Sequence, residues 1–225
     1  MLKIEINWYN FKKIKKMENI NHFINGKLFS DKNSRKGKVF NPATGEQIAE
    51  VELASKETVK MAVENSLQAF AKWSKTTPIT RARIFSKYKD LLVQNMNELA
   101  ELVSKQHGKT IPDAKGSIQR GIEVVEYVTG ITSSLKGEHS SNVGTNVDSH
   151  TLRQPLGVCA GITPFNFPAM VPMWMFPVAI ACGNTFVLKP SEKDPSCPLK
   201  LAELAIEAGF PPGVLNCVNG DKESV

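Results

Sequence analysis

Residues 157–168 read GVCAGITPFNFP, and this stretch decides the fold. Its first half, 157–162, is a short continuous apolar run, which is typical of a strand buried on both faces of a parallel sheet. Its second half is a loop framed by Pro164 and Pro168 that carries a single amide side chain, Asn166. We therefore predict a buried strand that leads into a rigid loop with one fixed hydrogen-bond donor.

Strand and helix patterns continue to alternate towards the end of the chain. The pattern predicts a helix over 169–182, a strand over 185–189, a helix over about 197–208 that ends at Gly209, and a strand over 214–218. The order β-α-β-α-β at these lengths predicts a parallel sheet with right-handed crossovers. The fold class that we expect is α/β, with an open, Rossmann-like parallel sheet and flanking helices.

Two turns near the N-terminus predict a small β element that precedes this sheet. Asn25-Gly26 separates two apolar pairs, and because both residues tolerate positive φ this is a two-residue hairpin signal. A second turn at 41–45 separates two further short apolar runs.

Three helical patterns lie between these turns and the sheet. The first follows Ser55 as its cap, the second runs from Pro78 to Gly108 as one helix or as two divided near 94–97, and the third covers 114–135. Their apolar stripes predict faces that pack against a core.

Composition is that of a soluble globular protein and argues against two function classes. Of 225 residues, 41% are hydrophobic and 22% charged, and no apolar run approaches the roughly 20 residues of a membrane helix. The net charge is +6, but residues 1–20 hold five lysines against two glutamates, so half of the excess (+3) lies in the N-terminal tail. No basic stripe with interleaved aromatic residues occurs, which argues against nucleic-acid binding.

The four cysteines indicate neither a metal site nor a disulfide framework. They form no CxxC pair and no cluster with the four histidines, so we expect no metal and a reducing compartment. The basic tail lacks the arginine and serine of a mitochondrial transit peptide, so we expect a cytoplasmic protein. The mitochondrial matrix is the alternative.

Two loops leave the predicted sheet at the carboxyl ends of its strands, where open α/β sheets bind ligands. One carries Asn166, and the other carries Lys189 and, three residues later, Glu192. A lysine that donates and a glutamate that accepts suit the two hydroxyls of a ribose, and a carboxylate there favours NAD over NADP. The residues alone leave two alternatives: a structural proline-rich turn for Asn166 and a solvated charge pair for Lys189 and Glu192.

Five ordered motifs make the chain similar to the aldehyde dehydrogenase superfamily over about residues 22–225. The motifs are FING at 23–26 with NPATG at 41–45, GK at 108–109, PFNFP at 164–168, GNT at 183–185 with KPSE at 189–192, and GFPPGVLN at 209–216. Within the superfamily the chain resembles the CoA-acylating methylmalonate-semialdehyde dehydrogenases, on the PFNFP loop with VPMWMFP at 171–177, on residues 189–195, and on Arg120-Gly121.

This resemblance implies roles for individual residues. Asn166 would be the catalytic side-chain donor of an oxyanion hole, and such a donor contributes about 3–4 kcal/mol in enzymes where one has been removed. Arg120 would bind the substrate carboxylate, because guanidinium offers paired donors, with a helix-surface salt bridge as the alternative. The cofactor-binding residues would be Thr163, Phe165, Lys189, Glu192 and Lys193, the last at a position where the family often has arginine.

The implied reaction is NAD-dependent oxidation of methylmalonate or malonate semialdehyde to propionyl-CoA or acetyl-CoA with loss of CO2, with CoA as co-substrate. The nucleophilic cysteine and a second carboxylate-binding arginine would lie beyond Val225, and none of the four cysteines takes that place, so we expect this chain alone to be inactive. The alternatives are a hydrolytic NAD(P)-dependent aldehyde or semialdehyde dehydrogenase and a non-catalytic nucleotide-binding fragment.

The patterns divide the chain into four parts, and the resemblance implies a homo-oligomer. The parts are a basic tail at 1–21 that we expect to be disordered, β-hairpins and helices of the NAD-binding domain at 22–136, a bridging or oligomerisation hairpin at 137–153, and a Rossmann-like core at 154–225 that is incomplete at its C-terminus.

Overall fold

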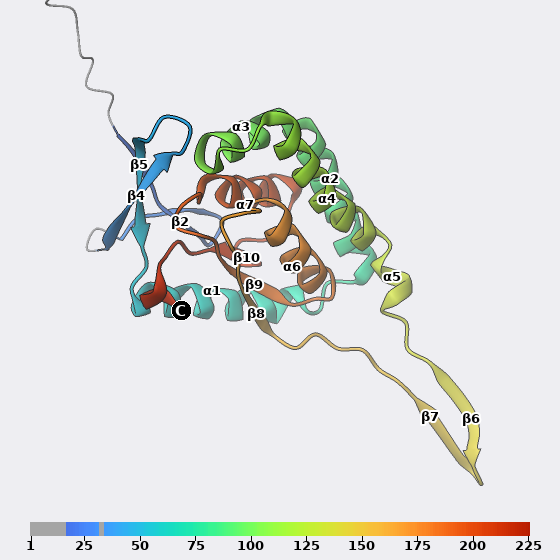
Figure 1. Ribbon diagram of the computed structural model, residues 1–225. Helices are drawn as coiled ribbons and strands as arrows, with labels where there is room; N and C mark the ends of the chain where they lie inside the picture. The colour runs from blue at the N-terminus through green and yellow to red at the C-terminus, as the bar shows by residue number, and fades with distance from the viewer. Residues whose placement is uncertain (1–16, 32–33) are drawn as a thin grey trace, which may run out of the picture.

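A five-stranded sheet with the order β3-β2-β10-β9-β8 lies at the centre of the computed structural model, which describes residues 17–31 and 34–225 (Figure 1). Three strands are parallel, as predicted: β8 (Val158–Ile162), β9 (Thr185–Lys189) and β10 (Leu215–Cys217). The crossovers are α6 (Met170–Ala181) and α7 (Ser196–Ala208). The sheet therefore has the β-α-β-α-β order that the sequence predicts.

Helices cover both faces of this sheet. Helix α1 (Lys56–Trp73) packs on the face opposite α6 and α7. Helices α2 (Pro78–Gln94), α3 (Met96–His107) and α4 (Ile111–Thr129) form an outer layer against α6 and α7. The break between α2 and α3 at Asn95 falls in the predicted interval, so the two-helix alternative is the right one.

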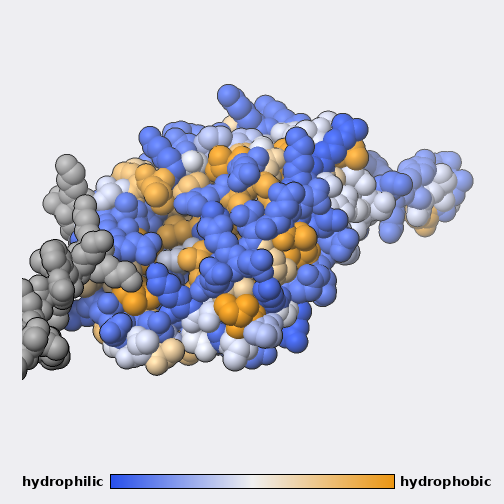
Figure 2. Space-filling model, turned by 90° about the horizontal axis from the view of Figure 1, so that it is seen from above, coloured by the Kyte–Doolittle hydropathy of each residue, from blue (hydrophilic) through white to orange (hydrophobic). Residues whose placement is uncertain are grey.

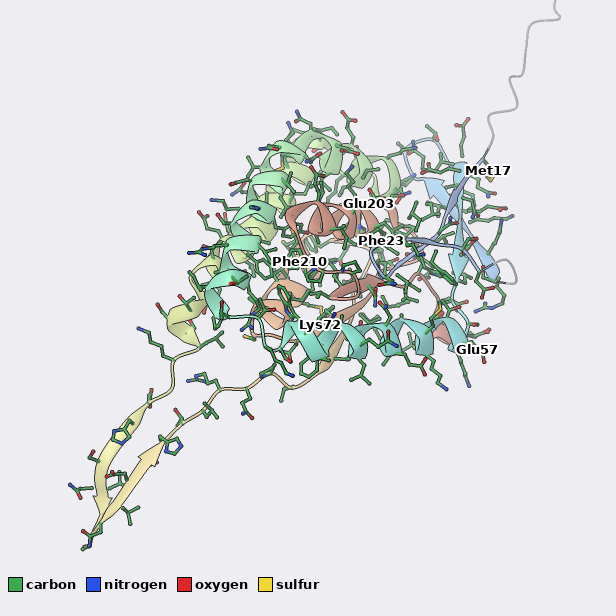
Figure 3. The ribbon with its side chains drawn as sticks, turned by 180° about the vertical axis from the view of Figure 1, so that it is seen from behind. Met17, Phe23, Glu57, Lys72, Glu203 and Phe210 are labelled. Atoms are coloured by element: carbon green, nitrogen blue, oxygen red, sulfur yellow. The ribbon has the colours of Figure 1, made fainter. Side chains whose placement is uncertain are left out.

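Phe210 is central to the core beneath these helices. Its ring lies 6.1 Å from that of Trp73, 4.9 Å from Phe85 and 5.6 Å from Tyr88, measured between centroids, and all four side chains are buried. Figure 3 shows Phe210 and Phe23 in the interior, with Glu57 and Lys72 towards the two ends of α1. Complete burial of one such aromatic side chain stabilises the fold by about 1.5–3 kcal/mol.

The hairpin of β2 (His22–Ile24) and β3 (Lys27–Phe29) has the predicted two-residue turn, with φ of 57° at Asn25 and 72° at Gly26. The sequence predicts this hairpin as a small β element that precedes the sheet. In the structure it belongs to the central sheet, because β2 pairs antiparallel with β10. Asn216 secures this junction: it accepts from the Asn25 N–H at 2.9 Å and donates to the Ala62 carbonyl of α1 at 3.0 Å.

A second sheet contains β1 (Glu18–Ile20), β5 (Glu46–Leu53) and β4 (Arg35–Asn41), and the turn predicted at 41–45 joins the last two. Strand β1 lies within the segment 1–21 that we expected to be disordered. That expectation is wrong for 18–20, because Ile20 is buried and this strand pairs with β5, while residues 1–16 lie outside the described part.

An exposed hairpin projects from the body of the protein after α5 (Ile131–Ser134). It consists of β6 (His139–Gly144) and β7 (Val147–His150), and every residue of both strands is exposed. Figure 2 shows a largely hydrophilic surface with this hairpin as an arm at one side. None of the described helices is long and apolar enough to cross a membrane.

Strand β8 is less buried than the sequence predicts. It is an edge strand with β9 as its one described neighbour, and Ile162 is 56% exposed. An apolar run therefore predicts the strand correctly, whereas its burial depends on what lies beside it in the sheet.

Candidate functional site

Two loops emerge side by side from the carboxyl ends of β8 and β9. Ile162 pairs with Lys189 at the last position of both strands. One residue further, the Thr163 N–H donates to the Lys189 carbonyl at 3.1 Å. The loops that carry Asn166 and Glu192 thus start from one hydrogen-bonded point, at the edge where parallel sheets bind ligands.

Lys189 and Glu192 form an ion pair beside this point. The Lys189 Nζ lies 3.5 Å from Glu192 Oε2, and the two side chains are 14% and 39% exposed. Lys189 is therefore mostly buried, which does not fit the alternative of a fully solvated pair. The neighbouring Thr163 Oγ1 is buried and has no hydrogen-bond partner among the described residues. A buried hydroxyl without a partner is costly, and a ligand hydroxyl there would satisfy it.

An apolar groove of about 320 Å³ adjoins Lys189, between α1 and the parallel strands. Val63, Val158, Val187 and Val218 are among its lining residues, and so is Lys189 itself. A flat apolar ring could lie in this groove with a polar group near the lysine.

The Pro164–Pro168 loop presents the Asn166 side chain to solvent. The side-chain amide has no hydrogen-bond partner among the described residues, and so it is available as a donor. The main-chain carbonyl of Asn166, in contrast, accepts a hydrogen bond from Lys109 Nζ at 2.7 Å. The same ammonium group lies 3.8 Å from the centroid of the Phe167 ring.

Phe165 and Lys193, both predicted cofactor contacts, also come together. Lys193 Nζ lies 4.6 Å from the centroid of the Phe165 ring, a cation–π contact between the two loops. His107 stacks on the same ring at 6.5 Å. The end of α3 and the two loops therefore converge here.

Arg120 lies on the exposed side of α4. Its main-chain carbonyl accepts a hydrogen bond from Trp174 Nε1 of α6 at 3.4 Å, and its guanidinium forms no ion pair with any described residue. The helix-surface salt bridge that was the alternative for Arg120 is thus absent from the described part of the chain. Burial lowers the pKa of Lys109, and the positive charge of Arg120 acts in the same direction.

Asp194 is a buried acidic residue for which the sequence pattern predicts no role. Its side chain is 2% exposed, and no described donor lies in hydrogen-bond geometry with either carboxylate oxygen. Burial raises the pKa of Asp194 to about 7, against the opposing effects of Ser191 and Lys109. Asp194 falls within the stretch 189–195 that carries the family resemblance, but its burial depends on tertiary packing and leaves no sequence pattern.

The environment of the four cysteines disfavours their thiolate forms. Cys197 and Cys217 are buried, Cys159 and Cys182 are half-buried, and burial raises the pKa of each thiol. A raised pKa disfavours the reactive thiolate, which agrees with the prediction that the nucleophile is none of these four. Over residues 17–31 and 34–225, no group of three His, Cys, Asp or Glu side chains could hold a metal ion.

The parallel sheet and its two polar loops define an α/β domain of the class that binds ligands at the carboxyl edge of the sheet. The chain belongs to the aldehyde dehydrogenase family, whose model matches residues 29–225. It is 54% identical over 209 residues to the malonate-semialdehyde dehydrogenase of Pseudomonas aeruginosa, with 93% of this chain and 42% of that protein covered. It is 49% identical to the acylating, mitochondrial methylmalonate-semialdehyde dehydrogenase of Arabidopsis thaliana, with 91% and 34% covered.

Solved structures show the same likeness. A methylmalonate-semialdehyde dehydrogenase from Oceanimonas doudoroffii superposes with a TM-score of 0.90 at 55% identity, covering 92% of this chain and 42% of that one. A structure from Sinorhizobium meliloti 1021, named for the same activity and complexed with NAD, gives 0.91 at 55% identity, covering 93% and 43%. The chain thus spans about two fifths of the length of most of these relatives.

Proposed function

We propose that this chain forms the NAD-binding part of a CoA-acylating semialdehyde dehydrogenase. The reaction converts malonate or methylmalonate semialdehyde, NAD and CoA into acetyl-CoA or propionyl-CoA, CO2 and NADH. One observation carries the proposal: the mostly buried Lys189 pairs with Glu192 at a strand end, and the same residue's carbonyl accepts from the N–H of Thr163, whose buried hydroxyl has no partner among the described residues. The names of the relatives support the substrate class.

NAD fits the residues at this edge. Lys189 can donate to a ribose hydroxyl while Glu192 accepts, and Thr163 can satisfy its hydroxyl on the same ligand. The apolar groove beside Lys189 suits the face of an adenine ring. The Glu192 carboxylate would repel a 2′-phosphate, which favours NAD over NADP. When bound, NAD supplies the hydride acceptor.

Two further side chains would act on the aldehyde. The Asn166 amide is a free donor on a proline-framed loop, and a preorganised donor stabilises the negative charge that develops on the aldehyde oxygen. The unpaired Arg120 guanidinium offers two parallel donors to a carboxylate, which suits the acid end of a semialdehyde. Phe165 and Lys193 would pack beside the cofactor.

The projecting hairpin supports a proposal of self-association. All residues of β6 and β7 are exposed, and Val143 and Val147 are 58% and 52% exposed. We propose that 137–153 packs against a second copy of the protein and buries these side chains in a homo-oligomer.

The deciding experiment measures NADH formation by the complete enzyme that carries this chain, with malonate semialdehyde, in the presence and absence of CoA. We expect NAD to be reduced rapidly only when CoA is present, with acetyl-CoA and CO2 as products. Equal rates with and without CoA would favour the hydrolytic alternative. Absence of NAD reduction, with NAD binding retained, would favour the non-catalytic alternative.

A further inference from the structure

We infer that Lys109 is a positioning residue that holds the Pro164–Pro168 loop so that the Asn166 amide can reach the reacting oxygen. This inference rests on the proposed function, in which Asn166 stabilises that oxygen. Lys109 itself would touch neither substrate nor cofactor.

Lys109 contacts the loop at two adjacent residues. Its Nζ donates to the Asn166 main-chain carbonyl at 2.7 Å and lies 3.8 Å from the centroid of the Phe167 ring. The first is a charge-assisted hydrogen bond and the second a cation–π contact, each stronger than its neutral counterpart. Together they fix the peptide plane that joins Asn166 to Phe167, and with it the direction in which the Asn166 side chain leaves the backbone.

Among the described residues, nothing else holds that carbonyl. The next carbonyl, of Phe167, accepts from the Val171 N–H at the start of α6, and so the loop is anchored after Phe167 by its own helix. Before Asn166, the loop is anchored at Thr163 through Lys189. Lys109 therefore holds the middle of the loop, through its hydrogen bond to the main-chain carbonyl of Asn166.

The backbone of Lys109 is itself rigidly placed between two helix caps. Gly108 ends α3 with φ of 86° and donates its N–H to the Ser104 carbonyl at 2.9 Å. Thr110 caps α4, and its hydroxyl accepts from the Asp113 N–H at 3.4 Å. A side chain that begins from such a fixed link loses less entropy on binding the loop than one from a mobile segment.

The charges around Lys109 favour this use of the ammonium group. Lys109 makes no ion pair with any described residue, although Asp113 and Asp194 are near enough to raise its pKa against the effect of burial. They offset the effect of burial only in part, so the pKa of Lys109 stays below its ordinary value, and neither side chain forms an ion pair with the ammonium group. Its hydrogen bond goes to the loop.

A positioning role predicts a specific kinetic pattern. The Asn166 amide is needed most when negative charge develops, so misplacing it lowers kcat. The proposed ribose contacts Lys189, Glu192 and Thr163 lie at the sheet edge, where the Thr163 N–H donates to the Lys189 carbonyl, and only Phe165 among the proposed cofactor contacts belongs to the Pro164–Pro168 loop. Loss of Lys109 should therefore lower kcat and spare NAD affinity.

The test compares Lys109→Met, Lys109→Arg and Lys115→Met in the complete enzyme. Lys115 is a matched control on α4, and its side chain makes no hydrogen bond or ion pair with any described residue. We expect Lys109→Met to lower kcat about 10-fold to 100-fold, the range for a displaced catalytic group, with the NAD dissociation constant within about twofold of the parent. Lys109→Arg, which keeps the cation and donor, should restore most of kcat, and Lys115→Met should match the parent.

A double-mutant cycle with Asn166→Ala separates positioning from general stability. In the Asn166→Ala background, Lys109→Met should lower kcat by less than about threefold, because the group that it positions is gone. The inference is overturned if Lys109→Met retains parental kcat, or if it lowers kcat equally in both backgrounds. Parental activity in Asn166→Ala alone would instead overturn the proposed role of Asn166, and the inference with it.

Discussion

The Thr163 N–H donates to the Lys189 carbonyl across 3.1 Å, and this bond sets the spacing between the two loops of the candidate site. It follows the pairing of Ile162 with Lys189 at the ends of β8 and β9. The amide of Asn166 and the carboxylate of Glu192 are thereby attached to one rigid edge of the sheet, which is what a bound dinucleotide and an aldehyde beside it would require.

Replacing Glu192 with glutamine should weaken NAD binding and relax its selectivity. Loss of a charged hydrogen-bond acceptor costs about 1.5–3 kcal/mol, so the NAD dissociation constant should rise about 10-fold to 100-fold. Affinity for NADP should fall less, because the carboxylate that repels the 2′-phosphate is gone. Fluorescence titration with both dinucleotides measures this. Glu207→Gln, on the exposed side of α7, is the control, and an unchanged NAD/NADP preference would contradict the ribose role.

Replacing Asn166 with alanine should lower kcat by about 100-fold to 1000-fold, the usual loss when one oxyanion donor is removed. The NAD dissociation constant should remain near that of the parent, because in the proposed role the amide acts on the aldehyde oxygen and not on the ribose. Steady-state kinetics together with direct NAD titration separate the two effects. A loss of NAD affinity as large as the loss of kcat would show that Asn166 mainly shapes the cofactor site.

Replacing Asp194 with asparagine should stabilise the protein at alkaline pH. The folded-state pKa is about 7 against 3.8 for the ordinary carboxyl, so the folded protein keeps a proton that the unfolded chain releases between these values. The free energy of unfolding therefore falls by at most about 4 kcal/mol as the pH rises from 4 to 7. It stays at that lower value above pH 7.

Asparagine does not ionise, so the variant does not lose stability as the pH rises from 4 to 7. The thermal midpoint of Asp194→Asn should exceed that of the parent at pH 8 and match it near pH 4. A difference that is the same at both pH values would mean that packing, and not ionisation, separates the two proteins.

Replacing Gly108 with alanine should destabilise the protein by about 1–2 kcal/mol, the cost of a left-handed backbone for a residue with Cβ. The added Cβ would also lie 2.8 Å from Pro42 Cγ, which must then shift. Gly116→Ala is the matched control, since it lies within α4 and the new Cβ would meet no atom outside its own helical turn within 4 Å. Alanine there should stabilise the helix by about 0.5–1 kcal/mol. Urea unfolding of both variants measures the contrast, and equal effects would contradict it.

Local signals predicted most of the secondary structure. Ser55 caps α1 by accepting the Thr58 N–H, Asn25-Gly26 forms the hairpin turn, and Gly209 ends α7 with φ of 107°. Each of these depends on side chains and φ values within a few residues, which is the range that a sequence pattern reports.

Contacts between distant segments could not be predicted in this way. The hairpin gives no sign that β2 pairs with β10, because its apolar residues would suit any sheet edge. The proximity of Lys109 to Asn166 joins positions 57 residues apart, and the burial of Asp194 depends on how the Lys189–Pro195 loop packs. Of the predicted site residues, Lys189 contacts Glu192 and Lys193 contacts Phe165, whereas their roles remain predictions.

The pairing of β2 with β10 imposes an order on biosynthesis. Phe23 is opposite Cys217, and the His22 ring accepts the Asn219 N–H, so the first hairpin is completed by some of the last residues described. During translation Phe23 and Ile24 leave the ribosome nearly two hundred residues before their partners. Contacts that close so long a loop form late in folding. Until then the nascent chain would expose the apolar side chains of this hairpin, which chaperones can bind.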